Sequence, residues 1–102
     1  MAADPYTIRV SPGAQQDVKS LRPFDQKKIV GGMETYLGWE PTKVSRSRIK
    51  QMVQPFWCQY RLRIEDFRVY YDVKQEHRTV TVLRILQKGQ AETPQEPDHE
   101  TD

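Results

Sequence analysis

The sequence is poor in the residues from which most catalytic and metal sites are built. It has one cysteine and two histidines in 102 residues, so an internal disulfide is excluded and no Cys/His metal centre is expected. His77 and His99 are far apart in the chain, and no Ser-His-Asp set suggests itself. No glycine-rich loop links a strand to a helix, which disfavours a phosphate-binding loop of that kind. We therefore predict no metal and no cofactor.

Long hydrophobic runs are also missing. No apolar stretch approaches the roughly 18 residues that cross a bilayer, and the N-terminus lacks the apolar core of a signal peptide. The single cysteine, Cys58, falls on the apolar side of a predicted strand, so we interpret it as a small core residue and not as a nucleophile. We expect a cytoplasmic protein with no membrane partner.

Charge is abundant but unevenly distributed. Residues 1–88 hold all 16 Lys and Arg with nine of the 14 acids, a net charge of +7. Residues 89–102 hold the other five acids and no Lys or Arg, a net charge of −5. We predict a single domain over residues 1–88 and an acidic, disordered or peripheral tail over residues 89–102. A basic body of this kind favours a polyanionic partner.

The stretch Trp57–Val73 predicts a β-hairpin with a two-residue turn at Glu65-Asp66, because apolar and polar residues alternate on both sides of that pair. The turn pairs Ile64 with Phe67, Arg63 with Arg68 and Arg61 with Tyr70. One face then carries the apolar side chains Cys58, Tyr60, Leu62, Ile64, Phe67, Val69, Tyr71 and Val73. The other face carries Gln59, Arg61, Arg63, Arg68 and Tyr70.

The arginine-bearing face of the hairpin indicates a binding site for an anion. Arg63 and Arg68 lie directly opposite each other, and like charges in that position destabilise a strand pair. A bound phosphate chain would relieve the repulsion, and Tyr70 and Trp57 nearby fit stacking on bases. Alternatively, the arginines extend into water and pair with scattered carboxylates. Arginines can also stabilise the charge of a pentacoordinate phosphorus while a positioned 2′-OH acts as nucleophile, without a metal.

The segment before the hairpin predicts one strand and two helices. Tyr6, Ile8 and Val10 alternate as in a short strand, and Ser11-Pro12 is typical of a helix start. The first helix presents Ala14, Val18 and Leu21 on one side and ends at Arg22-Pro23. The second starts near Phe24-Asp25, buries Ile29, Met33 and Leu37, and ends at Gly38. Within it, Gly31-Gly32 indicates either close packing on the sheet or a kink.

The remaining segments complete the predicted fold. Residues 42–55 show no clear period and read as a loop. They carry Lys43, Arg46, Arg48 and Lys50 with no acid, which indicates either a solvated loop or an extension of the basic surface. Arg78–Leu86 predicts a last, central strand, with Arg84 in phase with Val80 and Val82 and Lys88 just past its end. The fold class is α+β, in the order β-α-α-β-β-β, with a small, mostly antiparallel sheet and a helix hairpin on one face.

At residues 60–73 the sequence Y-R-L-R-I-E-D-F-R-V-Y-Y-D-V resembles the central motif of the RelE/ParE superfamily of type II toxin–antitoxin toxins, and in particular its RelE-like mRNA interferases. T-V-T-V-L-R-I-L-Q-K follows at the usual distance, at residues 79–88, and the strand and S-P-x-A-x-x-D-V-x-x-L helix at the front also match. The resemblance covers about residues 6–88. It implies a RelE-like fold, a cognate antitoxin as partner, and cleavage of mRNA on the ribosome with contacts to 16S rRNA.

The resemblance also implies roles for individual residues. Arg61, Arg68 and Lys88 match the catalytic positions. Arg48, Lys50 and Arg63 would bind the RNA backbone, and Tyr70 and Arg84 complete the expected RNA-binding set. The sequence departs from the family pattern at Gln59, where a basic residue is usual, at Lys88, where arginine is usual, and in having no tyrosine after Lys88.

These departures leave two other functions open. The chain is alternatively a ParE-like inhibitor of DNA gyrase, or a catalytically weak member of the fold that only binds an antitoxin or RNA. Cleavage of mRNA within codons on ribosomes would favour the mRNA interferase, and inhibition of supercoiling without such cleavage would favour the gyrase inhibitor. Neither effect, with antitoxin binding retained, would leave the binding protein.

Overall fold

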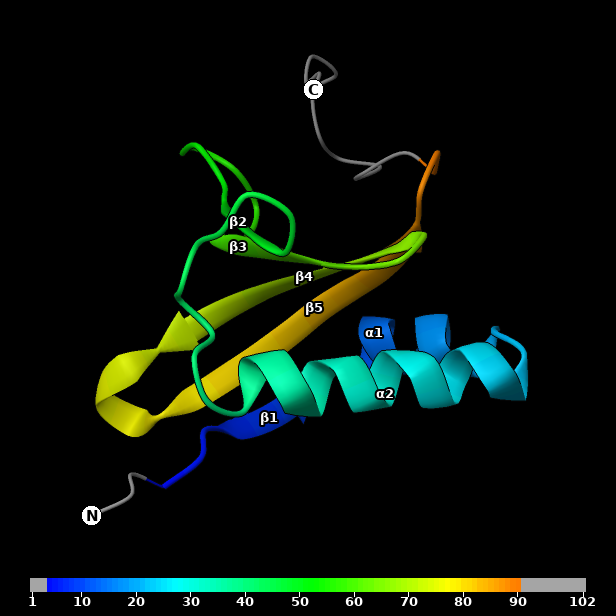
Figure 1. Ribbon diagram of the computed structural model, residues 1–102, viewed down its shortest axis with the longest axis horizontal. Helices are drawn as coiled ribbons and strands as arrows, with labels where there is room; N and C mark the ends of the chain where they lie inside the picture. Colours follow the sequence, from blue (N-terminus) through cyan, green and yellow to red (C-terminus); the bar gives the residue numbers. More distant parts are fainter. Residues whose placement is uncertain (1–3, 91–102) are drawn as a thin grey trace.

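The computed structural model describes residues 4–90 as one twisted sheet covered on one face by two helices (Figure 1). In chain order the elements are β1 (Thr7–Val10), α1 (Pro12–Lys19), α2 (Pro23–Leu37), β2 (Ile49–Gln51), β3 (Tyr60–Ile64), β4 (Phe67–Lys74), the 3₁₀ turn η1 (Gln75–His77) and β5 (Thr79–Gln87). The strand order is β1-β5-β4-β3-β2, and only the β1–β5 pair is parallel. The predicted α+β class and mostly antiparallel sheet are confirmed.

Both predicted helices are present, but α1 ends at Lys19 and not at Arg22-Pro23, so Leu21 follows the helix. The Ser11 hydroxyl accepts a hydrogen bond of 3.2 Å from the Ala14 amide and caps α1, as its position before Pro12 suggests. Helix α2 begins at Pro23, one residue earlier than expected, after Arg22 in the extended conformation that precedes proline. Its buried side chains Ile29, Met33 and Leu37 recur every four residues and form the stripe that faces the sheet.

The Gly31-Gly32 pair does not break α2, which continues through it without interruption. A Cβ atom on Gly32 would lie 2.6 Å from the Cδ1 atom of Ile64, so glycine lets the helix approach β3. Gly31 faces open space. Of the two glycines, only Gly32 therefore has a packing role.

The predicted register of the hairpin is confirmed pair by pair. Ile64 lies opposite Phe67, Arg63 opposite Arg68, and Arg61 opposite Tyr70. Glu65 in the turn has a positive φ of 51°, which a non-glycine residue adopts mainly in tight turns. The pairing of β4 with β5 shifts register between Tyr70 and Tyr71.

Two features of the sheet differ from expectation. Residues 42–55 are not only a loop, because they contain the edge strand β2, which pairs with β3. Of its three residues only Ile49 is buried, and a single apolar position produces no readable period. Strand β5 is interior, as expected, but the middle strand of the five is β4.

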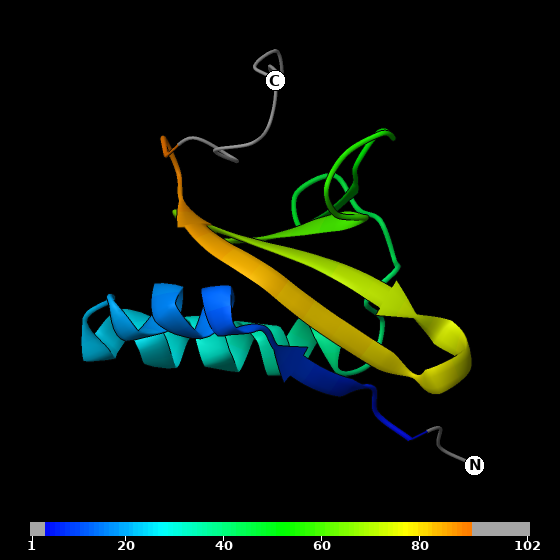
Figure 2. The ribbon, with the colours of Figure 1, turned by 180° about the vertical axis from the view of Figure 1, so that it is seen from behind.

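Helix α1 lies along the edge of β5 beyond the point where β1 ends. Strand β1 pairs with β5 only as far as Val10 opposite Val82. Beyond that point the Ser11 hydroxyl donates to the Leu83 carbonyl, and an Asp17 carboxylate oxygen accepts from the Ile85 amide at 2.8 Å. Figure 2 shows α1 beside this part of β5. The edge of β5 is thereby closed by side chains.

Two clusters of apolar side chains lie on opposite faces of the sheet. The larger one fills the space between the helices and the sheet. The smaller one, on the other face, contains Met52, Cys58, Tyr70 and Leu86, with Phe56, Trp57 and Leu83 packed against it. Cys58 is buried, as predicted, but its grouping with Tyr60 and Leu62 was wrong. Strand β3 begins only at Tyr60, and the preceding loop folds over the opposite face.

The chain leaves β5 at Gln87, and the Gln90 amide donates to the Gln87 carbonyl at 2.9 Å. The predicted acidic tail lies, from residue 91 onward, outside the described residues. Within residues 4–90, neither helix combines the length and hydrophobicity that crossing a bilayer requires.

Candidate nucleic-acid interface

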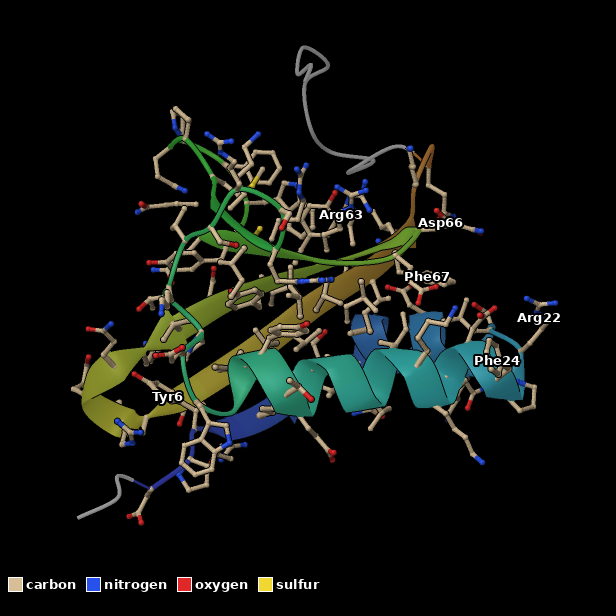
Figure 3. The ribbon with its side chains drawn as sticks, viewed as in Figure 1. Tyr6, Arg22, Phe24, Arg63, Asp66 and Phe67 are labelled. Atoms are coloured by element: carbon tan, nitrogen blue, oxygen red, sulfur yellow. The ribbon has the colours of Figure 1, made fainter. Side chains whose placement is uncertain are left out.

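A basic pocket of about 160 Å³ opens on the face of the sheet that the helices do not cover. The loop before β2 and the strands β2, β3 and β4 form it. Its ten lining residues are Val44, Ser45, Arg46, Ser47, Arg48, Ile49, Lys50, Arg61, Arg63 and Arg68. Six of these are Lys or Arg, and none is acidic. Figure 3 shows Arg63 on this side of the sheet and Phe67 on the helix side.

Strand register brings the cations of the pocket together. Lys50 on β2 lies opposite Arg61 on β3, and Arg63 on β3 lies opposite Arg68 on β4. Residues so paired have Cβ atoms about 4.5–5.5 Å apart, at which distance like charges repel. The predicted convergence of Lys50, Arg61, Arg63 and Arg68 is therefore present in the structure.

The environment of Arg68 shows this repulsion. Burial lowers the pKa of the Arg68 guanidinium, and the nearby charges of Arg61 and Arg63 lower it further. Its Nη1 atom donates to the carbonyls of Glu65 and Phe67, at 3.2 and 3.3 Å. These contacts hold the side chain beside the turn without neutralising it. An anion in the pocket would favour the charged form.

Arg48 has a structural role at the wall of the pocket. Its Nη1 atom donates to the Arg63 carbonyl at 2.9 Å, and its guanidinium lies 4.8 Å from the centroid of the Tyr36 ring. The Arg63 amide in turn donates to the Arg48 carbonyl. Arg48 thus joins α2 to β3 and lines the pocket from a fixed position. The acid-free run that contains it also supplies Arg46, which the predicted set of site residues omitted.

Three predicted site residues do not line this pocket. Arg84 forms an ion pair with Asp17, with 2.7 Å between Nε and Oδ2. That hydrogen bond raises the pKa of the Arg84 guanidinium. Tyr70 lies on the predicted face, but only 1% of its surface is exposed, because the loop before β3 covers it. Lys88 is exposed beyond β5, where its amide donates to the Asp66 carbonyl.

The structure gives Gln59 a role in the backbone. Its side-chain Oε1 atom accepts a hydrogen bond from the backbone amide of Val73 at 2.8 Å. Its backbone amide donates to the Asp72 carboxylate at 2.7 Å. The side chain thereby extends the β3–β4 pairing by one residue before the start of β3. Among the described residues, no group of three or more His, Cys, Asp and Glu side chains could hold a metal ion.

Comparison with known proteins places the chain in a family. Residues 8–92 match the family described as the ParE toxin of type II toxin–antitoxin systems, parDE. The chain belongs to this family. It is therefore a type II toxin of the RelE/ParE superfamily, as the motif at residues 60–73 predicts. No curated protein matches the sequence.

Solved structures of RelE-type proteins share the fold of this family member. The toxin–antitoxin complex RelBE2 from Mycobacterium tuberculosis contains a chain that is 26% identical, with a TM-score of 0.74 over 87% of this chain and 98% of that one. A chain of the RelE–RelB complex from Pyrococcus horikoshii is 20% identical, with a TM-score of 0.68 over 84% of this chain and 98% of that one. The isolated E. coli RelE toxin is 15% identical, with a TM-score of 0.63 over 85% and 88%.

Proposed function

We propose that this toxin is a ribosome-dependent mRNA endoribonuclease whose basic pocket holds the phosphate to be cleaved. The observation that carries the proposal is the pocket itself, in which six cationic and no acidic side chains surround about 160 Å³. Glu65, in the turn of the hairpin, is paired with Lys28 at 2.7 Å. A pocket so lined favours a phosphate chain over a neutral or cationic ligand.

The proposed reaction needs neither a metal nor a protein nucleophile. The 2′-oxygen of the RNA attacks the adjacent phosphorus, the bond to the 5′-oxygen breaks, and the proton of the 2′-OH ends on that leaving oxygen. The products are a 2′,3′-cyclic phosphate and a 5′-hydroxyl. Arg61 and Arg68 would hold the phosphate and stabilise the charge of the pentacoordinate state. Lys50 and Arg63 would bind the flanking backbone, and Lys88 would assist from the end of β5.

We further propose that a cognate antitoxin neutralises the toxin. The M. tuberculosis chain that shares its fold was solved in a toxin–antitoxin complex, and the P. horikoshii chain in a RelE–RelB complex. An antitoxin segment that covers the basic pocket would exclude RNA by occupying the same side chains.

The test is translation in vitro with purified ribosomes, followed by mapping of mRNA ends. The wild-type chain is expected to cut within codons and to leave 5′-hydroxyl ends. Arg68→Ala and Arg61→Ala should each lower the cleavage rate by about 10²–10³, the usual effect of removing one group that stabilises transition-state charge. Lys27→Ala, at an exposed position on α2, is the matched control and should cleave at the wild-type rate. Uncut mRNA with the wild-type chain would contradict the proposal.

The family match favours one other candidate, since it is to the ParE toxins. The same preparation should therefore be assayed for inhibition of DNA supercoiling by gyrase. Inhibition that survives Arg68→Ala, together with intact mRNA, would assign the chain to that activity. Absence of both activities, with antitoxin binding retained, would leave it a binding protein only.

A further inference from the structure

Three aromatic rings form a ladder on the same face of the sheet as the basic pocket. The rings of Trp57 and Tyr70 have centroids 5.0 Å apart, and those of Phe56 and Trp57 have centroids 5.4 Å apart with 28° between their planes. Tyr70, at the base, is buried, whereas Phe56 and Trp57 remain partly exposed. The two outer rings belong to the loop between β2 and β3.

The ladder borders the basic pocket along β4. Arg68 lines the pocket, and Tyr70, two residues further on the same strand, carries the ladder. Tyr70 lies directly opposite Arg61, and Arg68 lies opposite Leu86, which belongs to the apolar cluster beneath the rings. Cationic and aromatic surfaces therefore meet within one strand pair. This combination suits a single-stranded nucleic acid, because its phosphates bind cations and its bases stack on flat aromatic rings.

The indole of Trp57 has a further property. Its Nε1 atom is buried, and no hydrogen-bond partner for it exists among residues 4–90. Buried indole N–H groups normally find an acceptor, because an unmade hydrogen bond is costly. A loop that served only to close a small core would be expected to satisfy this donor. A nucleotide stacked on these rings would bring the acceptor atoms of its base and phosphate to this loop.

We propose that Phe56 and Trp57 form a stacking platform for one nucleobase of the single-stranded RNA whose phosphate lies in the basic pocket. The inference rests on the proposed RNA-binding function and adds a base-contacting surface to it. Stacking tolerates every base, since each has a flat π face. The platform thus positions a nucleotide next to the scissile phosphate and does not by itself select a sequence.

Fluorescence binding to 2′-O-methyl RNA hexamers, which lack the attacking hydroxyl, tests the proposal. The chain has two tryptophans, and Trp39→Phe leaves Trp57 as the only reporter. In this background Phe56→Leu keeps an apolar side chain but removes the ring, and it should weaken binding about 5- to 150-fold, the range for loss of one stacked base. Phe56→Tyr keeps the ring and should bind within about twofold of its parent.

A scan of abasic nucleotides through the hexamer separates stacking from loss of structure. One abasic position should weaken binding to the parent chain by the same factor as Phe56→Leu, and the two changes together should cost little more than either alone. Equal loss at every position, or full additivity, would overturn the platform. If Arg68→Ala still weakens binding in that case, RNA binding stands and only this inference fails. If the parent chain binds no RNA, the inference and the proposed function fail together.

Discussion

The carboxylate of Asp17 binds the Arg84 guanidinium and the Ile85 amide at once, through one oxygen 2.7 Å from Arg84 Nε and 2.8 Å from the amide nitrogen. The second oxygen accepts from Arg84 Nη2 at 3.1 Å. A residue of α1 therefore completes the hydrogen bonding of β5. Asp17 and Arg84 are 67 residues apart in the chain.

This relationship predicts a structural role for both side chains. Asp17→Ala leaves the Ile85 amide and the guanidinium without their acceptor and should lower the free energy of unfolding by about 2 kcal/mol. Arg84→Gln should cost less, about 1 kcal/mol, because its side chain is 35% exposed and solvent screens the pair. Chemical denaturation measures both changes, with Glu76→Gln on η1 as a surface control. The RNA affinity of Arg84→Gln should stay within about twofold of wild type. A large loss of RNA affinity would contradict this role and indicate that Arg84 contacts RNA.

The two glycines of α2 predict opposite effects of the same substitution. Gly31→Ala adds a methyl group in open space and should stabilise the protein by up to about 1 kcal/mol, the helix preference for alanine. Gly32→Ala places the methyl group against Ile64, and overpacking of about 1–3 kcal/mol should cancel or exceed that gain. Removal of the clashing atom by Ile64→Val should recover part of the loss. Equal stabilisation by both alanines would refute the packing role of Gly32.

Most of the fold could be predicted because it depends on local sequence patterns. The hairpin register followed from the alternation of apolar and polar residues and from a two-residue turn. A shift by one residue would move every apolar side chain to the face away from the helices. Both helices followed from the Ser11-Pro12 and Arg22-Pro23 signals and a regular apolar spacing. Strand β2 gave no such signal, since a three-residue edge strand with one buried residue has no period.

The predicted site residues that lie outside the pocket do so for a different reason, namely contacts between distant segments. Alternation placed Tyr70 on the correct face, but it cannot show that the loop at 52–59 folds over that face. The bond between Asp17 and Arg84 likewise has no local signature. The cations of the pocket were predictable because three of them, Arg61, Arg63 and Arg68, belong to the hairpin whose register the alternation defines.

The hydroxyl of Tyr71 predicts a dependence of stability on pH. It donates a buried hydrogen bond of 2.6 Å to the Pro41 carbonyl, and burial, with smaller effects of Tyr60 and Cys58, raises the pKa of this hydroxyl. Tyr71→Phe should lower the free energy of unfolding by about 1–2 kcal/mol at neutral pH. Because the folded pKa is raised, this contribution is complete below about pH 10 and is lost as the pH rises further. Denaturation from pH 7 to 10.5 should show the difference narrowing, and a constant difference would contradict this account.

Salt dependence should identify the residues that contact phosphates. For a single strand, the slope of log K against log salt concentration changes by about 0.7 for each phosphate contact. Lys50→Ala and Arg63→Ala should therefore each flatten the slope by about that amount, since both side chains line the pocket. Lys27→Ala should leave it unchanged. If the pocket variants weaken binding with no change of slope, their side chains do not neutralise phosphates.

The acidic residues of the C-terminal segment predict competition with RNA for the basic pocket. Glu92, Glu96, Asp98, Glu100 and Asp102 follow β5 with no Lys or Arg among residues 89–102. The chain leaves β5 beside the pocket, because Leu86, one residue before the end of the strand, pairs with Arg68. A short tether gives an effective concentration on the order of mM, so even weak binding of the carboxylates would reduce access for RNA.

Deletion of residues 90–102 should consequently raise RNA affinity several-fold at about 50 mM salt and have little effect near 1 M, where the screening length falls to about 3 Å. A chain of full length with Gln or Asn at the five acidic positions separates charge from tether length. It should reproduce the deletion, since the competing groups are the carboxylates. An RNA affinity with the same salt dependence in all three proteins would exclude competition by this segment.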